Sequence, residues 1–342
     1  MTKAGKTALI IGGGVAGMEA ALRIGQAGFD CVLAEKEEVL GGTVLQLSSS
    51  FPRWENPLEL VEERISQLKL CGRIKIMTAT SAIESRVSKH GYSVTLQSRN
   101  GETTNLDIDA VVLATGFGMM DVSVYGEYGY GIYPEVVNSL EFEARIKAWS
   151  AGLGKVPEGV AFFKCVGSRD RSKGYPYCSK ICCMYTAKQA GLVKDMFPYT
   201  KVYVFYMDYR AAGKCYEEFV REVIEKKHVT YVRGRPAKIL PEGGKLLVRA
   251  EDTLIGIPIE VSVDIVVLAS AAVPRRETGP LAEMFGAKAD KYGFLERQRF
   301  SLAKASDRVF FAGGCGFPLE TLAAQQEGAS AAAEVIELFA HE

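Results

Sequence analysis

Short apolar runs that end in glycine set the organisation of this chain. Residues 7–11 form an apolar run that leads into Gly12-Gly13-Gly14-Val15-Ala16-Gly17, and residues 18–24 continue with apolar positions at helical spacing. A second apolar run, residues 31–34, ends at Glu35. This order predicts a buried strand, a tight turn, a helix and a second strand.

Two later runs repeat the strand-and-turn pattern. Residues 110–113 lead into Ala114-Thr115-Gly116, and residues 309–311 lead into Ala312-Gly313-Gly314. An alanine-rich segment with helical spacing follows at residues 321–338. The last strand can therefore complete the sheet that the first strands begin.

The middle of the chain carries its own alternation of strands and helices. We expect strands at residues 160–164, 201–207, 230–232, 245–249, 257–261 and 265–269, and helices at residues 179–195 and 216–226. The sequence thus predicts an α/β protein with two Rossmann-like three-layer domains, one inserted into the other. The split domain comprises residues 1–133 and 271–342, and the inserted domain comprises residues 134–270.

The spacing of the glycines in the first domain indicates a nucleotide-binding turn. Gly12, Gly14 and Gly17 form G-x-G-x-x-G between a strand and a helix, where the backbone can approach a pyrophosphate at the helix N-terminus. Glu35 follows about twenty residues later, where a carboxylate can accept hydrogen bonds from an adenosine ribose. We therefore expect a dinucleotide cofactor.

Four cysteines, Cys165-x12-Cys178-x3-Cys182-Cys183, dominate the inserted domain. Thiolates at such spacing suit a soft metal centre, and a cubane iron–sulfur cluster takes four of them. A helix that begins near Ser179 would place Cys178 and Cys182 on one face. Six basic residues between 164 and 188 would lower the thiol pKa values and offset a cluster's negative charge.

Other roles for these cysteines stay open. A structural zinc site usually has two separated Cys-x2-4-Cys knuckles, which the vicinal pair and the long gap fit poorly. Buried free thiols combined with a redox disulfide are a further alternative. A disulfide framework suits small secreted chains rather than one of 342 residues that can build an ordinary core.

The composition limits the classes of binding partner and the cellular location that we expect. The formal net charge is +0, and basic residues are concentrated only around the cysteines, so nucleic acid and anionic membranes have no electrostatic support as partners. No apolar stretch approaches the length of a membrane span, and the N-terminal residues lack the pattern of a signal peptide. We expect a reducing, cytoplasmic location.

The inserted domain lacks the second glycine turn that a nicotinamide nucleotide would need. The strand at residues 160–164 runs into Cys165-Val166-Gly167-Ser168-Arg169-Asp170 instead. We therefore expect no conventional NAD(P)H site. The chain also lacks hydrolase, zinc-protease and Walker motifs, so its chemistry must come from cofactors.

These residues resemble the flavin-binding A subunit of heterodisulfide reductase and its shorter relatives in heterodisulfide-reductase-like complexes of sulfur oxidation. The similarity covers nearly the whole chain. It rests on the glycine turn with Met18-Glu19-Ala20-Ala21, on Tyr128-Gly129-Tyr130-Gly131, on Cys165-Val166-Gly167-Ser168-Arg169-Asp170 with Tyr177-Cys178-Ser179, on Cys182-Cys183-Met184-Tyr185, on residues 206–219 and on residues 233–237.

The resemblance implies FAD on a thioredoxin-reductase-like, two-dinucleotide-binding-domain fold and a [4Fe-4S] cluster. The implied cluster ligands are Cys165, Cys178, Cys182 and Cys183. The implied FAD contacts are Gly12, Gly14, Val15, Ala16, Gly17, Glu35, Lys36, Gly42, Thr43, Ala114, Thr115, Gly116, Gly313, Gly314, Leu322 and Ala323. The chain departs from ordinary relatives at Ala312-Gly313-Gly314, where a Gly-Asp pair is usual.

The leading interpretation is an electron-transfer protein, a homodimer that works with other heterodisulfide-reductase-like subunits. The chain lacks the ferredoxin-type cysteine runs of the long family members, so we expect electron relay rather than bifurcation. One alternative is a freestanding NAD(P)H-dependent disulfide or quinone reductase. Another is a cofactor-stabilised scaffold or sensor, with the tyrosine-rich residues 125–133 as its docking surface or, instead, packed between the domains.

Overall fold

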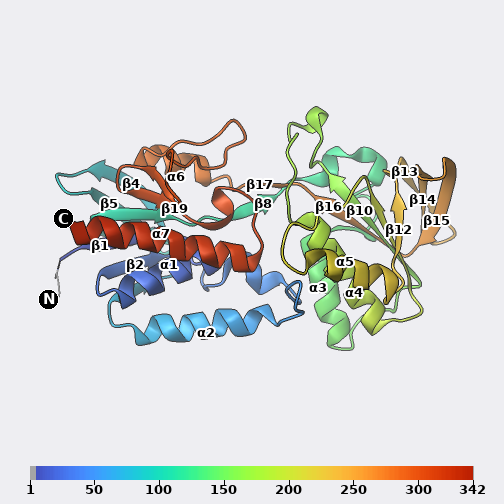
Figure 1. Cartoon of the computed structure of the whole chain (residues 1–342), viewed down its shortest axis with the longest axis horizontal. Helices are drawn as coiled ribbons and strands as arrows, with labels where there is room; N and C mark the ends of the chain where they lie inside the picture. Colours follow the sequence, from blue (N-terminus) through green and yellow to red (C-terminus); the bar gives the residue numbers. More distant parts are fainter. Residues whose placement is uncertain (1–4, 342) are drawn as a thin grey trace. The chain divides into compact units, whose positions relative to one another are not determined.

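The structure is a computed structural model that describes residues 5–341 (Figure 1). The chain divides into two compact units. Unit 1 contains the described residues up to Leu45, Pro57–Gly118 and the described residues from Val273 on. Unit 2 contains Gln46–Asn56 and Met119–Ala272. The glycine turn therefore belongs to unit 1 and the four-cysteine segment to unit 2.

A six-stranded sheet in the order β18-β19-β7-β1-β2-β3 forms the centre of unit 1. Its strands are β1 (Thr7–Ile11), β2 (Asp30–Ala34), β3 (Ile74–Met77), β7 (Ala110–Leu113), β18 (Lys304–Ser306) and β19 (Val309–Phe311). β1 is parallel to both of its neighbours. Its residues alternate between two cores, with Ala8 and Ile10 in one and Leu9 and Ile11 in the other. Burial on both faces explains why the run is continuously apolar.

Helices cover one face of this sheet and a second sheet covers the other. The first core contains side chains of α1 (Val15–Gln26), α2 (Pro57–Leu70) and α7 (Thr321–His341). The second contains side chains of β4 (Thr80–Val87), β5 (Tyr92–Ser98), β6 (Thr103–Ile108) and α6 (Thr278–Phe285). α1 and α7 lie side by side (Figure 1), and a Cβ atom at Gly328 would lie 2.3 Å from the Ala16 carbonyl oxygen. Glycine is therefore required for this close helix contact.

Unit 2 repeats the layered plan around a five-stranded sheet in the order β12-β11-β10-β16-β9. Its strands are β9 (Val136–Asn138), β10 (Gly159–Val166), β11 (Lys201–Tyr206), β12 (Thr230–Arg233) and β16 (Ile265–Ser270). The helices are α3 (Ser139–Ser150), α4 (Cys182–Met196) and α5 (Tyr216–Glu225). A separate antiparallel sheet contains β13 (Lys238–Glu242), β14 (Lys245–Asp252) and β15 (Ile257–Val263). All eight residues of β10 are buried, as expected for a central strand.

Short elements complete the chain. β8 (Phe117–Met119) and β17 (Ala272–Pro274) pair where the chain passes from one unit to the other. The 3-10 turns are η1 (Gly42–Gln46), η2 (Val122–Val124), η3 (Gly126–Tyr128), η4 (Arg171–Lys173) and η5 (Gly313–Cys315).

The predicted domain boundary at residue 133 is wrong, because the chain leaves unit 1 after Gly118. The tyrosine-rich segment packs inside unit 2. Tyr128 donates to the Pro236 carbonyl oxygen at 3.0 Å, and its ring centroid lies 5.2 Å from that of Phe163. Tyr125 donates to Asp170 at 2.7 Å. Tyr125 and Tyr128 are thus buried and do not form a docking surface.

The segment Gln46–Asn56 is a second departure from the predicted boundaries, because it packs within unit 2. The Trp54 and Phe219 ring centroids lie 4.7 Å apart. Ser48 donates through its backbone N–H to Glu143 at 2.7 Å. Glu143 also forms a buried ion pair with Lys188 at 2.6 Å, and Lys188 donates to the Ser49 carbonyl oxygen at 3.0 Å. A buried polar network therefore fixes this segment to α3 and α4.

The positive charge of Lys188 in this network favours the ionised form of Glu143. Burial alone would raise the pKa of Glu143, but the Lys188 ammonium and the hydrogen bonds from Lys188, Ser48 and Gln189 hold it below its usual value. Removal of Lys188 would leave a buried carboxylate without its counter-charge.

We expect Lys188→Met to lower the free energy of unfolding by about 3–5 kcal/mol, because breaking one partner of a buried pair strands the other. Arg221→Met is the matched control: Arg221 forms an exposed pair with Glu217 on α5, and its loss should cost less than about 1 kcal/mol. Urea unfolding of the whole chain measures both. Equal losses in the two variants would contradict this assignment.

Candidate functional site

The turn between β1 and α1 contains three glycines of the motif, and the space around each of them differs. Gly12 has φ +114°, and a Cβ atom there would lie 2.3 Å from the Ala114 carbonyl oxygen. At Gly17 a Cβ atom would lie 1.9 Å from the Gly12 carbonyl oxygen. Gly14 differs, because a Cβ atom there would meet no described atom within 4 Å. Gly12 and Gly17 close the turn, and Gly14 faces open space.

The N-terminus of α1 faces that open space. Gly14 is the N-cap and supplies no side-chain cap, and Met18 N–H donates to the Gly14 carbonyl oxygen as the first helical hydrogen bond. The N–H groups of the first turn, which includes Val15, Ala16 and Gly17, lack intrahelical partners. With the helix dipole, they suit a diphosphate.

Glu35 lies beside the turn, as the sequence predicts. It is buried at the end of β2, and its carboxylate accepts from Gly13 N–H at 2.6 Å and from Glu37 N–H at 2.9 Å. The neighbouring Lys36 forms an ion pair with Glu277. Glu35 is therefore held rigidly at the turn, whereas Lys36 is held by Glu277, the N-cap residue of α6.

The strand-end residues from the rest of unit 1 converge on the same turn. Gly14 and Gly41 form a β-bridge, so that Gly42 lies against Gly14. The Thr115 hydroxyl bonds to Thr278 at 2.9 Å, next to Gly116.

Arg275 is a residue that sequence reasoning missed. Its guanidinium donates to the Thr43 hydroxyl at 3.2 Å, and its Nε atom is buried with no hydrogen-bond partner among residues 5–341. The nearest atom to a Cβ built on Gly116 is the same Nε, at 3.9 Å. An unpaired buried donor here points to a polar group of a ligand.

The C-terminal contribution to the site contains a second missed residue, Glu327. The predicted contacts Gly313 and Gly314 form η5, and Gly313 N–H donates to Glu327 at 2.9 Å. Leu322 and Ala323 lie in the first turn of α7, where Leu322 is exposed. Glu327 belongs to the next turns of α7, so a carboxylate lies near η5 although the usual Gly-Asp pair is absent.

In unit 2, a register shift in β10 positions the first cysteine. The pairing of β10 with β16 shifts between Phe163 and Val166, and Cys165 within this bulge has φ +59°. A bulge bends a strand and redirects its side chains. Cys165 is thus turned toward the start of α4.

The prediction that Cys178 and Cys182 share a helix face is wrong. α4 begins at Cys182. Lys180, two residues earlier, has φ +62°, a left-handed conformation that an α-helix does not contain. Cys178 lies in the preceding loop, where its sulfur accepts from Lys180 N–H at 3.4 Å. The Ser179 hydroxyl bonds to Ser168 at 2.8 Å and accepts from Ala272 N–H at 3.0 Å, which fixes this loop against the strand ends.

Three of the four predicted thiols interact directly. Hydrogen bonding to Cys165 and Cys183, together with burial, raises the pKa of Cys182 well above its usual value. The hydrogen bond from Cys182 lowers the pKa of Cys165, and it lowers the pKa of Cys183 to about 5 with help from the Lys164 charge. The proton is therefore held most strongly by Cys182, and thiolate character falls on Cys165 and Cys183.

The four cysteines are not gathered into one metal-binding group. Within residues 5–341, no cluster of three or more His, Cys, Asp or Glu side chains is arranged to hold a metal ion. Cys182 interacts with Cys165 and with Cys183, and the half-buried Cys178 accepts from Lys180 N–H within its own loop. The predicted cage therefore requires a rearrangement of these three thiols as well as of the Cys178 loop.

The chemistry around the thiols nevertheless fits a sulfur-rich anionic group. Four buried polar atoms, Lys164 Nζ, Tyr185 OH, Tyr231 OH and Ser270 Oγ, find no partner of normal hydrogen-bond geometry in the described part of the chain. Burial raises the pKa of Tyr185 and of Tyr231, and the neighbouring cysteines raise both further. Such unpaired donors are rare in interiors and indicate a missing acceptor.

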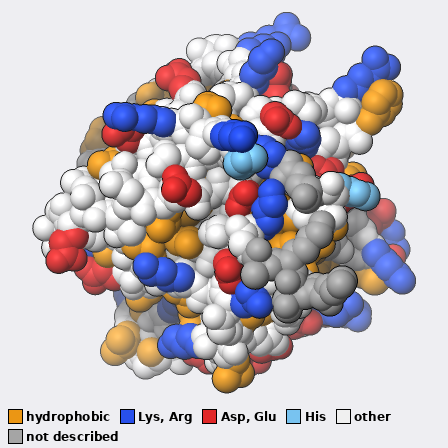
Figure 2. Space-filling view, turned by 90° about the vertical axis from the view of Figure 1, so that its left-hand side faces the viewer, with side chains coloured by type: hydrophobic (Ala, Val, Ile, Leu, Met, Phe, Trp, Pro, Cys, Tyr) orange, Lys and Arg blue, Asp and Glu red, His pale blue; other side chains and the backbone are white. Residues whose placement is uncertain are grey.

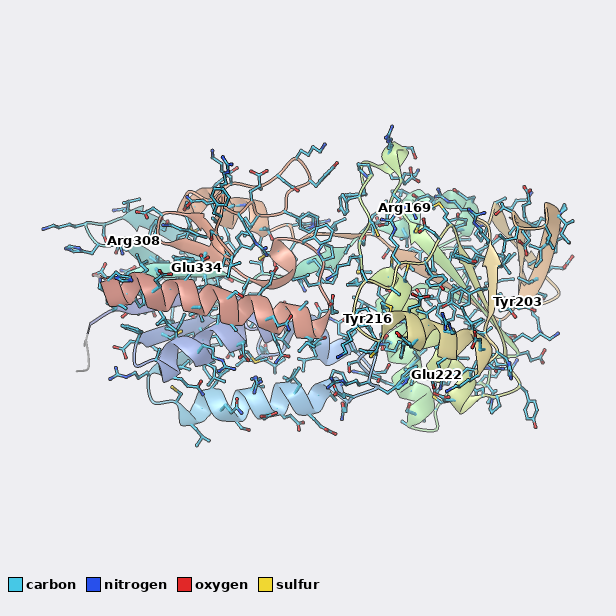
Figure 3. All side chains as sticks on the ribbon, viewed as in Figure 1. Arg169, Tyr203, Tyr216, Glu222, Arg308 and Glu334 are labelled. Carbon is cyan, nitrogen blue, oxygen red and sulfur yellow. The ribbon has the colours of Figure 1, made fainter. Side chains whose placement is uncertain are left out.

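A second cation lies beside this centre. Arg169, labelled in Figure 3, donates to Asp208, and the charges of Cys165 and Cys178 contribute to its raised pKa. It therefore lies close enough to both cysteines for their charges to interact.

Comparison with known proteins shows what the chain is similar to. Residues 6–146 match the pyridine nucleotide-disulphide oxidoreductase family. An iron-sulfur A subunit of CoB–CoM heterodisulfide reductase from Methanopyrus kandleri is 29% identical over 95% of the chain and 63% of its own length. The corresponding protein of Methanocaldococcus jannaschii is 30% identical over 96% of the chain and 64% of its own length.

Over nearly its whole length the chain is similar to proteins named as A subunits of heterodisulfide reductase. This similarity confirms the predicted resemblance. The chain spans less than two thirds of each of these two relatives, at 63% and 64% of their lengths.

Solved structures confirm the predicted fold class of this chain. Thioredoxin reductase of T. acidophilum superposes with a TM-score of 0.68 at 17% identity, covering 98% of this chain and 100% of its own. A NAD-dependent persulfide reductase from A. fulgidus gives a TM-score of 0.63 at 22% identity, covering 96% and 58%. The fold is therefore the two-domain, thioredoxin-reductase-like fold.

Surface charge and helix hydropathy bear on possible partners. Acidic and basic side chains are interspersed on the face that Figure 2 draws. None of the helices within residues 5–341 combines the length and apolar character of a membrane span. The predicted absence of nucleic-acid and membrane partners stays a prediction.

Substitutions at Gly14 and Gly17 separate the effect on cofactor binding from the effect on folding. Gly14→Ala places a methyl group where no protein atom lies, so it should lower the amount of bound dinucleotide while changing the stability of the cofactor-free protein by less than about 0.5 kcal/mol. Gly17→Ala forces overpacking against Gly12 and should destabilise the same protein by about 1–3 kcal/mol. Cofactor absorbance after desalting and unfolding of the stripped protein measure these effects. Unaltered cofactor content in Gly14→Ala would contradict the assignment of the open space.

Proposed function

We propose that the chain is an FAD- and [4Fe-4S]-containing electron-transfer subunit of a heterodisulfide-reductase-like complex in sulfur metabolism. The observation that carries this proposal is the group of interacting thiols with unpaired buried donors at the end of β10. In unit 1 the corresponding strand end is a glycine turn suited to a diphosphate. The two units would then hold two redox groups.

Residues of unit 1 would hold the FAD. The N–H groups at the start of α1 would bind the diphosphate, with the Gly14 face leaving room for it. Glu35, already fixed by Gly13, would orient the adenosine ribose. Arg275 would give its unpaired Nε hydrogen to a polar group of the cofactor near Thr43.

Residues of unit 2 would hold the cluster. Cys182 already interacts with Cys165 and Cys183, and a rearrangement of these thiols and of the Cys178 loop would bring the four sulfurs together. Metal binding releases the thiol protons, and the unpaired Tyr231 and Ser270 hydroxyls would donate to the sulfurs. When bound, the two groups accept and release electrons, and the surrounding protein excludes water from them.

The names of the relatives support the proposed partners. The relatives are named as heterodisulfide reductase subunits, so we propose that other such subunits bind this chain and hold its sulfur substrate. We retain a homodimer, a cytoplasmic location, and electron relay without bifurcation as parts of the proposal. The shorter family members of sulfur-oxidation complexes remain the proposed context.

The second candidate function is a freestanding NAD(P)H-dependent disulfide or quinone reductase. The match of residues 6–146 to the pyridine nucleotide-disulphide oxidoreductase family favours it. Against it, β10 runs into the Cys165 bulge and not into a second glycine turn. The buried Cys182 and Cys183 are also poorly exposed for exchange with a disulfide substrate.

Anaerobically purified protein should contain about one FAD, and about four iron and four sulfide atoms, as one cubane cluster requires. Cys182→Ser and Cys183→Ser should lose the iron and keep the FAD, because separate units hold the two groups. Cys215→Ser is the control, since this exposed thiol lies outside the cysteine group. Zinc in place of iron and sulfide, or equal loss of FAD from both variants, would refute the relay.

NADH should leave the flavin oxidised under anaerobic conditions, because unit 2 has no glycine turn at the end of β10 that could bind the nucleotide. Dithionite should reduce both the flavin and the cluster in the same sample. Visible absorbance follows the flavin, and electron paramagnetic resonance follows the cluster. Rapid and complete bleaching of the flavin by NADH would instead favour the reductase.

A further inference from the structure

The segment between β17 and α6 is tied at both of its ends to other parts of unit 1. At its start, Arg275 donates to the Thr43 hydroxyl at 3.2 Å. At its end, the Thr278 hydroxyl bonds to the Thr115 hydroxyl at 2.9 Å. All four residues belong to unit 1. The fold of this unit therefore fixes the position of Arg275 without the help of a ligand.

Two other segments of unit 1 flank the glycine turn. At one end of the turn, a Cβ atom on Gly12 would lie 2.3 Å from the carbonyl oxygen of Ala114, the residue that follows β7. At the other end, a Cβ atom on Gly42, the first residue of η1, would lie 3.2 Å from the Gly14 Cα atom. The end of β7 and the start of η1 therefore border the site at which we place the diphosphate.

The Arg275 guanidinium reaches both of these flanking segments. Its Nη2 atom donates to Thr43, the residue after Gly42. Its Nε atom is the nearest atom to a Cβ built on Gly116, at 3.9 Å, and Gly116 lies three residues after the end of β7. This Nε is buried and finds no acceptor among residues 5–341. Arg275 therefore holds an unused, charged N–H group beside the glycine turn.

A diphosphate at this turn needs a counter-charge from outside the turn. Residues 12–17 contain no charged side chain, and the buried Glu35 carboxylate accepts from the backbone of the turn at 2.6 Å. Phosphate groups would add further negative charge close to this carboxylate. Lys36 already forms an ion pair with Glu277. The guanidinium of Arg275 is placed to supply the counter-charge.

We propose that Arg275 is a cofactor-binding residue that donates its Nε hydrogen to a phosphate oxygen of the dinucleotide. This inference rests on the FAD of the proposed function, and it names the part of the cofactor that Arg275 contacts. A hydrogen bond between a guanidinium and a phosphate joins two charged groups, so it is stronger than one between neutral groups. Its removal therefore weakens the binding of ligands that contain the diphosphate and spares ligands that lack it.

The test compares Arg275→Met and Arg275→Lys with the unaltered full chain after the FAD has been removed. Arg276→Met is the matched control, because Arg276 is the next residue and is exposed. Isothermal titration calorimetry with FAD, ADP, adenosine and riboflavin gives the dissociation constants. ADP has the diphosphate without the flavin, and neither adenosine nor riboflavin has a phosphate. Urea unfolding of the stripped proteins compares their stability.

Arg275→Met should weaken the binding of FAD and of ADP by a similar factor of about 10–100, the range expected for one hydrogen bond between charged groups. Adenosine and riboflavin should bind as they do to the unaltered chain. Arg275→Lys keeps the charge without the planar donor group, so its loss should be smaller. Added salt should weaken ADP binding more in the unaltered chain than in Arg275→Met. Arg276→Met should match the unaltered chain with all four ligands.

Three results would overturn the inference. Unchanged ADP affinity in both Arg275 variants would exclude the phosphate contact. A loss of riboflavin affinity as large as the loss for FAD would place Arg275 at the flavin instead. Equal losses for adenosine and ADP would show that Arg275 only maintains the shape of the site. Failure of the unaltered chain to bind either FAD or ADP would refute the proposed function itself.

Discussion

The register shift in β10 is the constraint on which the cysteine centre depends. Successive side chains of an unbroken strand point to opposite faces of a sheet. The shift instead allows both Lys164 and Cys165 to act on Cys183. The left-handed backbone at Cys165 costs about 1–3 kcal/mol, and the surrounding buried strand must hold it in place. Strain stored in this way is characteristic of functional positions.

The two units use one backbone plan for two kinds of chemistry. In unit 1, β1 passes through a turn of glycines into α1, and the turn offers backbone N–H groups. In unit 2, β10 passes through a loop into α4, and the start of that helix carries Cys182 and Cys183. The first arrangement requires the absence of side chains, and the second requires side chains of one type. The same helix-end field favours negative charge in both.

The sequence predicted the central elements well because strands buried on both faces leave continuous apolar runs. β1, β7 and β10 all follow this rule. The antiparallel sheet that contains β4 was missed, since its exposed positions interrupt the apolar pattern. The start of α4 was misplaced because the positive φ of Lys180 is a tertiary outcome that no local residue preference announces.

The residues of the candidate site that belong to a local sequence motif could be predicted. Single residues that only folding brings to the site could not. The glycine turn and the cysteine spacing are local patterns. Arg275 and Glu327 stand alone in sequence and reach the glycine-turn unit only through folding. Cys178 was predicted as a partner on a helix face, yet its place depends on the Ser168 and Ser179 contacts. Tertiary hydrogen bonds, rather than residue periodicity, decide these positions.

The Gln46–Asn56 segment has a consequence for how such a protein can diverge. Unit 2 is assembled from two separate stretches of chain. A recombination event that carried only Met119–Ala272 into another gene would therefore remove the contacts that Glu143, Lys188 and Phe219 make with the Gln46–Asn56 segment. Substitutions in the short stretch and in α3, α4 or α5 are energetically coupled. The short stretch must therefore be inherited together with the longer one, which makes modular exchange of this half of the protein difficult.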